Sequence, residues 1–282
     1  MLKFVVIGIV LYLAFSMNLI VGCVALLLAI GFILYWNIPF FHARKGSKAF
    51  NENDMETAIK EYEKAYKTGR ASAETILTYA ILLLRNGKPQ DAVTIFNLII
   101  MNTKNKADFK NKAKQYRALA YYKLGNADDA LDEAEEVFDN YRNTISYGLL
   151  GYLKIATNAS PDEIFALCKE GYEYNSDDRD ICDNYAYACI RTGRFDTAKK
   201  IINTMLEKFP TFTEAYYHGA MAYYMTREYD KAVSLLDQIE KKCISTYLTT
   251  ISKDDVESLR NEIIVRKKKE QAAKDGIEND KI

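Results

Sequence analysis

The sequence predicts an all-α protein built from repeated helix pairs, and three columns of residues at a common spacing carry this prediction. In the first column a mostly small residue recurs at intervals of 34, 38, 34, 34 and 34 residues. Its members are Ala58, Ala92, Ala130, Ile164, Ala198 and Ala232. The second column lies twelve residues earlier and contains Gly46, Ala80, Ala118, Tyr152, Ala186 and Ala220. The third column lies at the turn between the two helices and contains Asn53, Gly87, Gly125, Ala159, Gly193 and Arg227. A fixed period of this length indicates a solenoid in which each pair packs on the next.

Each unit also has the residue spacing of amphipathic helices. In the first unit Ala58, Tyr62, Ala65 and Tyr66 are spaced so that they share one helix face. The stretch "SPDE" at 160–163 reads as a capping box, with Ser at the N-cap, Pro at the first helical position and Glu three residues after the cap. Strand-like alternation is absent from the sequence, so helices are expected throughout.

These columns resemble the tetratricopeptide repeat, a 34-residue unit of two antiparallel helices with small residues where they cross and a Gly between them. The resemblance covers residues 39–240 and implies a right-handed α-solenoid of about six helix pairs. Three departures stand out. The family's early Trp is missing, Ile164 replaces the crossing Ala of unit four, and four extra residues fall in 102–112.

The ends of a solenoid need a polar cap. Residues 241–271 are expected to provide it as a C-terminal capping helix, mainly over Ser252–Gln271, and residues 272–282 are expected to form a disordered tail.

Residues 1–38 are expected to form a membrane anchor, because Phe4 to Trp36 are 33 residues without a formal charge and a span needs about 20. The stretch "SMN" at 16–18 divides this run, so a helical hairpin, a single long span and a cleaved secretory signal remain as interpretations. Basic residues follow the run at 42–48, which favours a cytoplasmic repeat domain. The expected location is the plasma membrane, with residues 4–36 in the bilayer.

Charge and motifs exclude several function classes. The chain has 38 basic and 38 acidic residues, so no basic footprint for nucleic acid is present. It has two histidines and no nucleotide-binding or calcium-loop motif. The five cysteines lack metal-ligand spacing and are expected to be reduced structural thiols. We therefore expect no enzyme, no cofactor and no metal site.

The resemblance implies a partner-binding groove, because in this family the first helix of each unit lines the concave surface. An apolar, tyrosine-rich groove would suit an apolar or amphipathic segment of a protein partner. The family's Lys/Asn/Arg clamp for a peptide carboxylate has only isolated counterparts here, Lys112 and Arg117. The groove candidates are Leu77, Ile81, Leu84, Gln115, Leu119, Tyr122, Leu149, Leu153, Asp183, Tyr187, Ile190, Tyr217, Met221 and Tyr224.

Six carboxylates between residues 128 and 136 could suggest an acidic site. In the repeat register Asp128 and Asp129 instead lie in the first turn of a helix, where they offset the positive end of its dipole. The other four, Asp132, Glu133, Glu135 and Glu136, are expected to point largely to solvent, and their excess suggests a basic partner surface.

The expected function is a membrane-tethered scaffold or adaptor that binds protein or peptide partners in its groove. The alternative is an envelope-assembly or secretion-associated component whose repeat domain faces outward.

Overall fold

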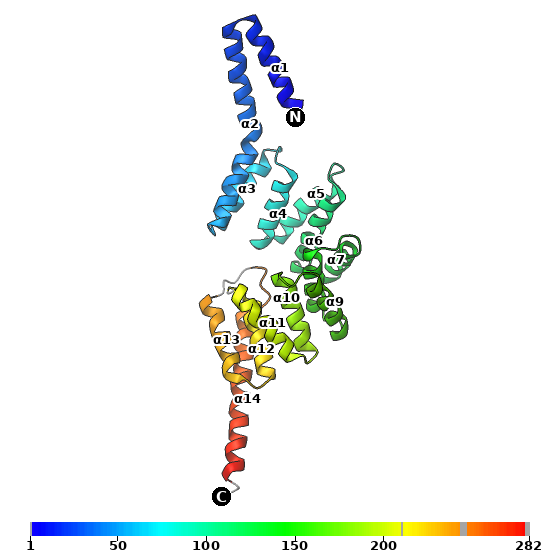
Figure 1. The fold of residues 1–282 in the computed structure, drawn as a ribbon, viewed down its shortest axis with the longest axis vertical. Helices are drawn as coiled ribbons and strands as arrows, with labels where there is room; N and C mark the ends of the chain where they lie inside the picture. The colour runs from blue at the N-terminus through cyan, green and yellow to red at the C-terminus, as the bar shows by residue number, and fades with distance from the viewer. Residues whose placement is uncertain (1, 210, 243–246, 280–282) are drawn as a thin grey trace. The chain divides into compact units, whose positions relative to one another are not determined.

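The computed structural model describes residues 2–209, 211–242 and 247–279 (Figure 1). Within these ranges no residue lies in a strand, which confirms the all-α class. The helices in chain order are α1 (Leu2–Met17), α2 (Leu19–Asn51), α3 (Met55–Lys67), α4 (Ala73–Arg85), α5 (Pro89–Met101), α6 (Ala107–Lys123), α7 (Ala127–Asn140), α8 (Thr144–Ala156), α9 (Pro161–Tyr174), α10 (Arg179–Arg191), α11 (Phe195–Lys208), α12 (Thr213–Met225), α13 (Tyr229–Lys242) and α14 (Lys253–Asn279). They divide into two compact units, an N-terminal unit of residues 1–84 and a C-terminal unit of residues 85–282.

α1 and α2 form a helical hairpin at the start of the N-terminal unit (Figure 1). The side-chain oxygen of Asn18 accepts the N–H of Ile20 at 2.7 Å and that of Val21 at 3.4 Å. This N-cap satisfies donors that the start of α2 leaves unpaired. The ring of Phe15 covers Gly22, where a Cβ would lie 2.2 Å from it, so the two helices approach closely. The backbone therefore turns at Asn18 instead of continuing as one helix.

The hairpin exposes its apolar side chains. Leu27 and Leu28 are each 69% exposed, and only 6% of the most apolar window of α2 is buried. By length and composition α2 could cross a membrane, and Val5–Met17 forms a shorter apolar helix. A core helix of a soluble domain would hide such side chains, so this surface is suited to an apolar partner or a bilayer.

The second part of α2 is also the first helix of repeat one. It packs against α3, and Gly46 lies against the ring of Tyr62, where a Cβ would be 2.6 Å away. Nearby, His42 Nδ1 lies 2.6 Å from Glu61 Oε2. Because α2 continues through Pro39, the apolar segment and the first repeat share one unbroken helix.

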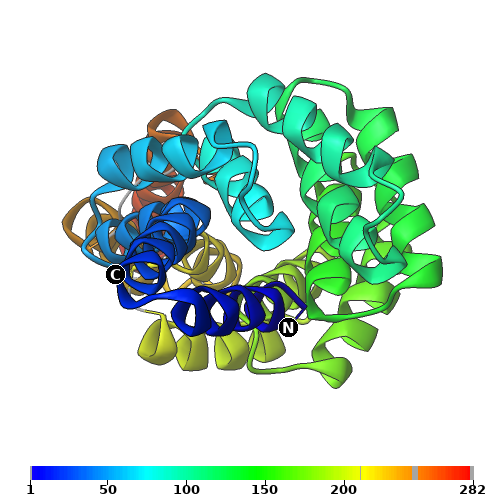
Figure 2. The same cartoon turned by 90° about the horizontal axis from the view of Figure 1, so that it is seen from above.

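The C-terminal unit begins with α5 and continues with the pairs α6–α7, α8–α9, α10–α11 and α12–α13, which follow one another side by side (Figure 2). Left-handed glycines stand in the turns at Gly125 (φ +86°) and Gly193 (φ +75°), a conformation that costs Gly little. Between α8 and α9 the left-handed residue is Asn158 (φ +56°), one position before the expected Ala159. Asn adopts this conformation more readily than Ala does.

The small residues of the two columns lie at the helix crossings. Ala118, Ala186 and Ala198 are all 0% exposed, and so is Ile164, which replaces Ala in unit four. The spacing in the sequence therefore identified positions at the centre of the packing between helices.

Ala186→Leu is expected to lower the free energy of unfolding by about 1–3 kcal/mol, because the added methyl groups must displace packed neighbours. Ala166, exposed on α9, is the matched control: Ala166→Leu should change stability by less than about 0.5 kcal/mol. Chemical denaturation of the full chain, followed by its helical circular dichroism, measures both. Equal losses for the two variants would contradict a helix crossing at Ala186.

The expected capping box at the start of α9 forms only in half. Ser160 Oγ accepts the N–H of Glu163 at 3.3 Å, as a cap should. The Glu163 carboxylate, however, lies 2.7 Å from Lys154 Nζ. An ion pair with α8 therefore takes the place of the expected bond back to the cap.

α14 closes the C-terminal unit against α12 and α13. Its residues Val256, Leu259 and Ile263 share a core with Leu236 of α13; the role of this helix as the cap of the solenoid stays a prediction. The helix continues past the expected end at residue 271 to Asn279, and residues 280–282 of the expected tail lie outside the described residues.

Candidate functional site

The first helices of the repeats in the C-terminal unit, α6, α8, α10 and α12, lie side by side. We call the surface that they form the first-helix face. Eleven of the fourteen groove candidates belong to these helices. The other three, Leu77, Ile81 and Leu84, lie on α4 in the N-terminal unit, where Leu77 and Leu84 are buried and Ile81 is half-buried.

The structure separates the eleven candidates on the first-helix face into two groups. Five are buried: Gln115, Leu153, Asp183, Ile190 and Tyr224. Six are half-buried and keep part of their side chain accessible: Leu119, Tyr122, Leu149, Tyr187, Tyr217 and Met221. The second group extends over all four helices, so the face offers apolar and aromatic side chains along its whole length.

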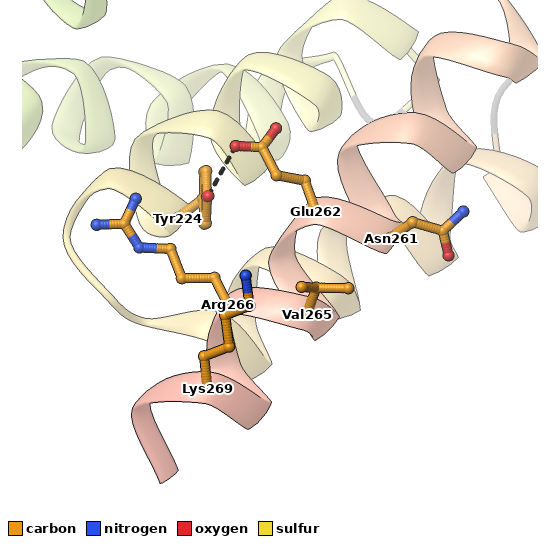
Figure 3. A pocket seen from close by; sticks show the side chains of 6 residues that line it. All are labelled: Tyr224, Asn261, Glu262, Val265, Arg266 and Lys269. Atoms are coloured by element: carbon orange, nitrogen blue, oxygen red, sulfur yellow. Dashed lines mark hydrogen bonds between the residues drawn. The ribbon is translucent and has the colours of Figure 1, made fainter. Parts of the chain in front are cut away.

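Two of the buried candidates show what removes a side chain from the surface. Leu153 is 0% exposed within the core shared by α6, α7, α8 and α10. Tyr224 is covered by α14, and its hydroxyl donates to Glu262 Oε1 at 2.8 Å (Figure 3). An open pocket of about 510 Å³ lies between α12 and α14 at this contact; its lining residues are Tyr224, Asn261, Glu262, Val265, Arg266 and Lys269.

A buried polar pair joins α10 and α12, the last two helices of the face. His218 Nδ1 on α12 is 2.7 Å from Asp183 Oδ1 on α10, and both side chains are almost fully buried. The ring of Tyr187 packs beside His218 at a centroid distance of 4.9 Å. The pair ties two neighbouring first helices together, which is a structural use of the histidine.

Burial opposes the charged form of His218, but the carboxylates of Asp183 and Glu214 outweigh it and raise the pKa of the imidazole. A raised pKa in the folded chain stabilises the fold below the unfolded value of about 6.5, and this contribution is lost as pH rises through the folded pKa. The chain has two histidines, so histidine-selective isotope labelling gives two NMR titration curves, which a His42→Gln variant assigns. We expect Asp183→Asn to lower the pKa of His218. An unchanged titration would contradict the pairing.

Family models described as tetratricopeptide repeat match residues 158–222 in one case and residues 112–144 and 214–243 in another. The matched stretches are helix pairs of the C-terminal unit, with crossing residues at the positions that define the repeat. The chain carries tetratricopeptide repeats. None of the curated proteins compared with it matches significantly.

Solved structures of other proteins share the fold. A tetratricopeptide repeat protein from Parabacteroides merdae is 17% identical, with 85% of this chain and 91% of that chain covered and a TM-score of 0.54. A thermophilic one from Thermus thermophilus is 15% identical, with coverage of 69% and 100% and a TM-score of 0.53. A chain of the Cut9–Hcn1 complex is 12% identical, with coverage of 87% and 49% and a TM-score of 0.66.

The tetratricopeptide register also identifies polar residues that the candidate set omitted. Glu214 lies three residues before Tyr217, at the second position of the first helix in repeat six, and it is 9% exposed. Lys123 follows Tyr122 at the end of α6 and is half-buried. The hydroxyl of Tyr152, a large residue in a column of small ones, is buried and has no hydrogen-bond partner among the described residues. Two sequence features could have identified these residues. One is a charged residue at a repeat position that usually holds an apolar residue, and the other is a large residue at a position that usually holds a small one.

The isolated candidates for a carboxylate clamp do not form one. The Arg117 guanidinium donates from Nε to both oxygens of Glu133 on α7, at 3.1 and 3.0 Å, and also bonds Asn97 on α5. Its donors are therefore used inside the repeat. Lys112 is half-buried on α6. Because the Arg117 guanidinium bonds other residues, Arg117 does not join Lys112 as the second cation of a carboxylate clamp.

Three of the six carboxylates in the acidic stretch of α7 pair with basic residues of the same chain. Asp128 and Asp129 occupy the first turn, as expected. Glu133, expected to face solvent, is 8% exposed instead and pairs with Arg117. Glu136 lies 2.8 Å from Lys114 and Glu135 lies 2.5 Å from Lys154. Glu133, Glu135 and Glu136 therefore pair with basic residues of neighbouring helices, and a basic partner surface for this stretch stays a prediction.

Three cysteines of the C-terminal unit are buried free thiols: Cys168, Cys182 and Cys189. Burial raises the pKa of Cys168 to about 12 and that of Cys182 to about 11, so both stay protonated at neutral pH and are poor nucleophiles. Cys23 is exposed on α2, and Cys243 lies outside the described residues. Among the described residues no group of His, Cys, Asp and Glu side chains could hold a metal ion.

Proposed function

We propose that this chain is a scaffold that binds a segment of a protein partner on the first-helix face of its C-terminal unit. The observation that carries the proposal is the row of six half-buried apolar and aromatic side chains on α6, α8, α10 and α12. Completing the burial of such side chains contributes about 25 cal/mol per Å² of apolar surface. A partner segment with apolar side chains would supply the opposing surface. Repeat proteins of this fold generally act as scaffolds, and we propose no catalysis, cofactor or nucleic-acid binding.

The experiment compares partners recovered by crosslinking and pull-down from the full chain in its membrane. Leu119→Asp and Tyr187→Asp place charges on α6 and α10 of the face, and Ala166→Asp places one on the exposed side of α9. We expect partners to be lost from the Leu119/Tyr187 double variant and kept by the control. Identical partners on all versions would refute binding at this face.

We further propose that α1 and α2 tether the scaffold to a bilayer. Supporting this are the exposed apolar side chains of the hairpin, the length of α2, and the aromatic pair Tyr35 and Trp36 at the end of the uncharged run, where an interface belt is expected. A tether raises the local concentration of a bound partner near the membrane, which can strengthen assembly by orders of magnitude without a new contact.

The proposed topology places the repeat domain in the cytoplasm at the plasma membrane. The basic residues His42, Arg44, Lys45 and Lys48 follow the apolar run, and positive charge near membrane-spanning segments is retained on the cytoplasmic side. A reporter fused after Ile282 that works only in the cytoplasm should be active. Activity of a reporter that folds only outside would instead support an outward-facing envelope component.

A further inference from the structure

Residues 247–252, which precede α14, lie against the first-helix face. They contact three separate places in the C-terminal unit. The Tyr247 ring packs on Gly87 in the turn before α5, where an added Cβ would lie 3.2 Å from it. The segment then passes the end of α6 and the start of α12 before the chain enters α14 (Figure 1). We call residues 247–252 the strap.

Two charged side chains hold the strap through its main chain. Lys123 Nζ donates to the carbonyl oxygen of Leu248 at 3.4 Å, and Glu214 Oε1 accepts the N–H of Thr250 at 3.1 Å. The Tyr247 hydroxyl adds a 3.5 Å bond to the carbonyl of Lys123, with the ammonium 5.6 Å from its ring centroid. In a helix these main-chain groups are already paired, so the two side chains recognise a segment that is not helical.

Both charged groups are held in a partly dehydrated place. Burial raises the pKa of Glu214 against the bond from Thr250, and burial lowers the pKa of Lys123 against the attraction of Glu214. Removing charges from water is costly unless hydrogen bonds compensate. The main chain of the strap supplies such bonds, so the two residues have the properties of a built site for a peptide backbone.

The strap is nevertheless held lightly. The bond from Lys123 to Leu248 is 3.4 Å long and that from Tyr247 to the carbonyl of Lys123 is 3.5 Å long, and Tyr247 remains 39% exposed. Ile251, at its end, packs against the core of α12, α13 and α14. Residues 247–250 can therefore leave the face while Ile251 keeps α14 in place.

We propose that the strap is an intramolecular ligand of the first-helix face, and that a non-helical segment of the partner protein displaces it and takes over the main-chain bonds to Lys123 and Glu214. This inference rests on the proposed function and adds the conformation of the partner and a built-in competitor. Because the strap is tethered, it competes at an effective concentration in the millimolar range, so only a partner that also engages the apolar side chains of the face can replace it.

The test uses the full chain in detergent micelles and the labelled peptide acetyl-Tyr-Leu-Thr-Thr-Ile-amide, which carries the strap sequence 247–251. One chain is wild type; in the other, residues 247–250 are replaced by Gly-Ser-Gly-Pro with Ile251 retained, so that position 250 has no N–H to donate to Glu214. Fluorescence anisotropy should show about tenfold tighter binding to the replaced chain, as expected if the strap fills the site about nine-tenths of the time. Equal helical content and melting temperature establish that the replaced chain is folded.

Two controls examine the main-chain bonds. In the replaced chain, Glu214→Ala should abolish peptide binding, whereas Glu214→Gln keeps an acceptor and should retain part of it. A peptide N-methylated at its second threonine lacks the N–H that meets Glu214 and should not bind. Equal binding of the methylated peptide, or equal binding to wild-type and replaced chains, would overturn the inference.

Pull-down of partners with the same two chains separates this inference from the proposed function. If the partner needs the strap's site, the replaced chain captures more of it than wild type does. Equal capture that remains sensitive to Leu119→Asp would refute the strap as competitor and leave the scaffold intact. Capture that is insensitive to Leu119→Asp would refute the scaffold itself.

Discussion

Deletion of residues 2–36 is expected to move the chain from the membrane pellet to the soluble fraction. Between Leu19 and Trp36 the sequence has eleven Leu, Ile, Val and Phe residues, each worth about 0.3–0.6 kcal/mol at the centre of an inserted helix. Their sum favours insertion by several kcal/mol, and α1 adds a second apolar surface. The full chain should therefore resist alkaline carbonate extraction, and the shortened chain should appear in the supernatant.

A matched control distinguishes membrane anchoring by the hairpin from nonspecific hydrophobic adsorption to the membrane. Leu98 is 53% exposed on α5, outside the hairpin, so Leu98→Arg should leave the membrane association of the full chain unchanged. Full-length protein that alkaline carbonate releases completely would show that α1 and α2 cover some other apolar surface, and the tether would be wrong.

Arg117→Met is expected to lower the free energy of unfolding by about 3 kcal/mol, because it leaves the Glu133 carboxylate buried without its partner. The side chains of the pair are 18% and 8% exposed, and the guanidinium also reaches α5 through Asn97. One substitution thus weakens the contacts among α5, α6 and α7. Chemical denaturation of the full chain, followed by circular dichroism, measures the loss.

The double variant Arg117→Met/Glu133→Leu should recover most of that loss, since apolar replacement of a buried ion pair is often close to neutral. Lys114→Met is the exposed counterpart, because its partner Glu136 is 61% exposed, and it should cost less than about 1 kcal/mol. A double variant as unstable as Arg117→Met alone would show that the pair does not act as a unit.

The fold was predictable because its determinants are local and periodic. A small residue at most crossings and a left-handed residue at each turn recur along the chain, so Ala186 and Gly193 could be placed from spacing alone. The turn between α8 and α9 differs from the prediction. Its left-handed residue is Asn158 instead of Ala159, because Asn adopts this conformation more readily than Ala does. The ends of helices are harder to predict. α2 continues through Pro39, and no local signal there marks a boundary between the apolar segment and the first repeat.

The site was predictable only in outline. The repeat register predicts on which helix a residue lies, but the exposure of its side chain depends on which other elements cover that helix. α14 covers Tyr224, and Glu133 is buried where it pairs with Arg117 of another helix. Lys123 and Glu214 lie far apart in the sequence, yet in the fold they attract each other and both bond the strap. Such non-local contacts follow from the closure of the solenoid and leave no pattern in the sequence.

Site-specific photocrosslinking in the native membrane tests the central claim most directly. A photoreactive amino acid at Tyr187 on the first-helix face should crosslink a partner protein, and the adduct should disappear with Leu119→Asp. The same amino acid at Ala166, on the exposed side of α9, should give no adduct. Adducts from Ala166 alone, or adducts from Tyr187 that persist with Leu119→Asp, would contradict binding at the first-helix face.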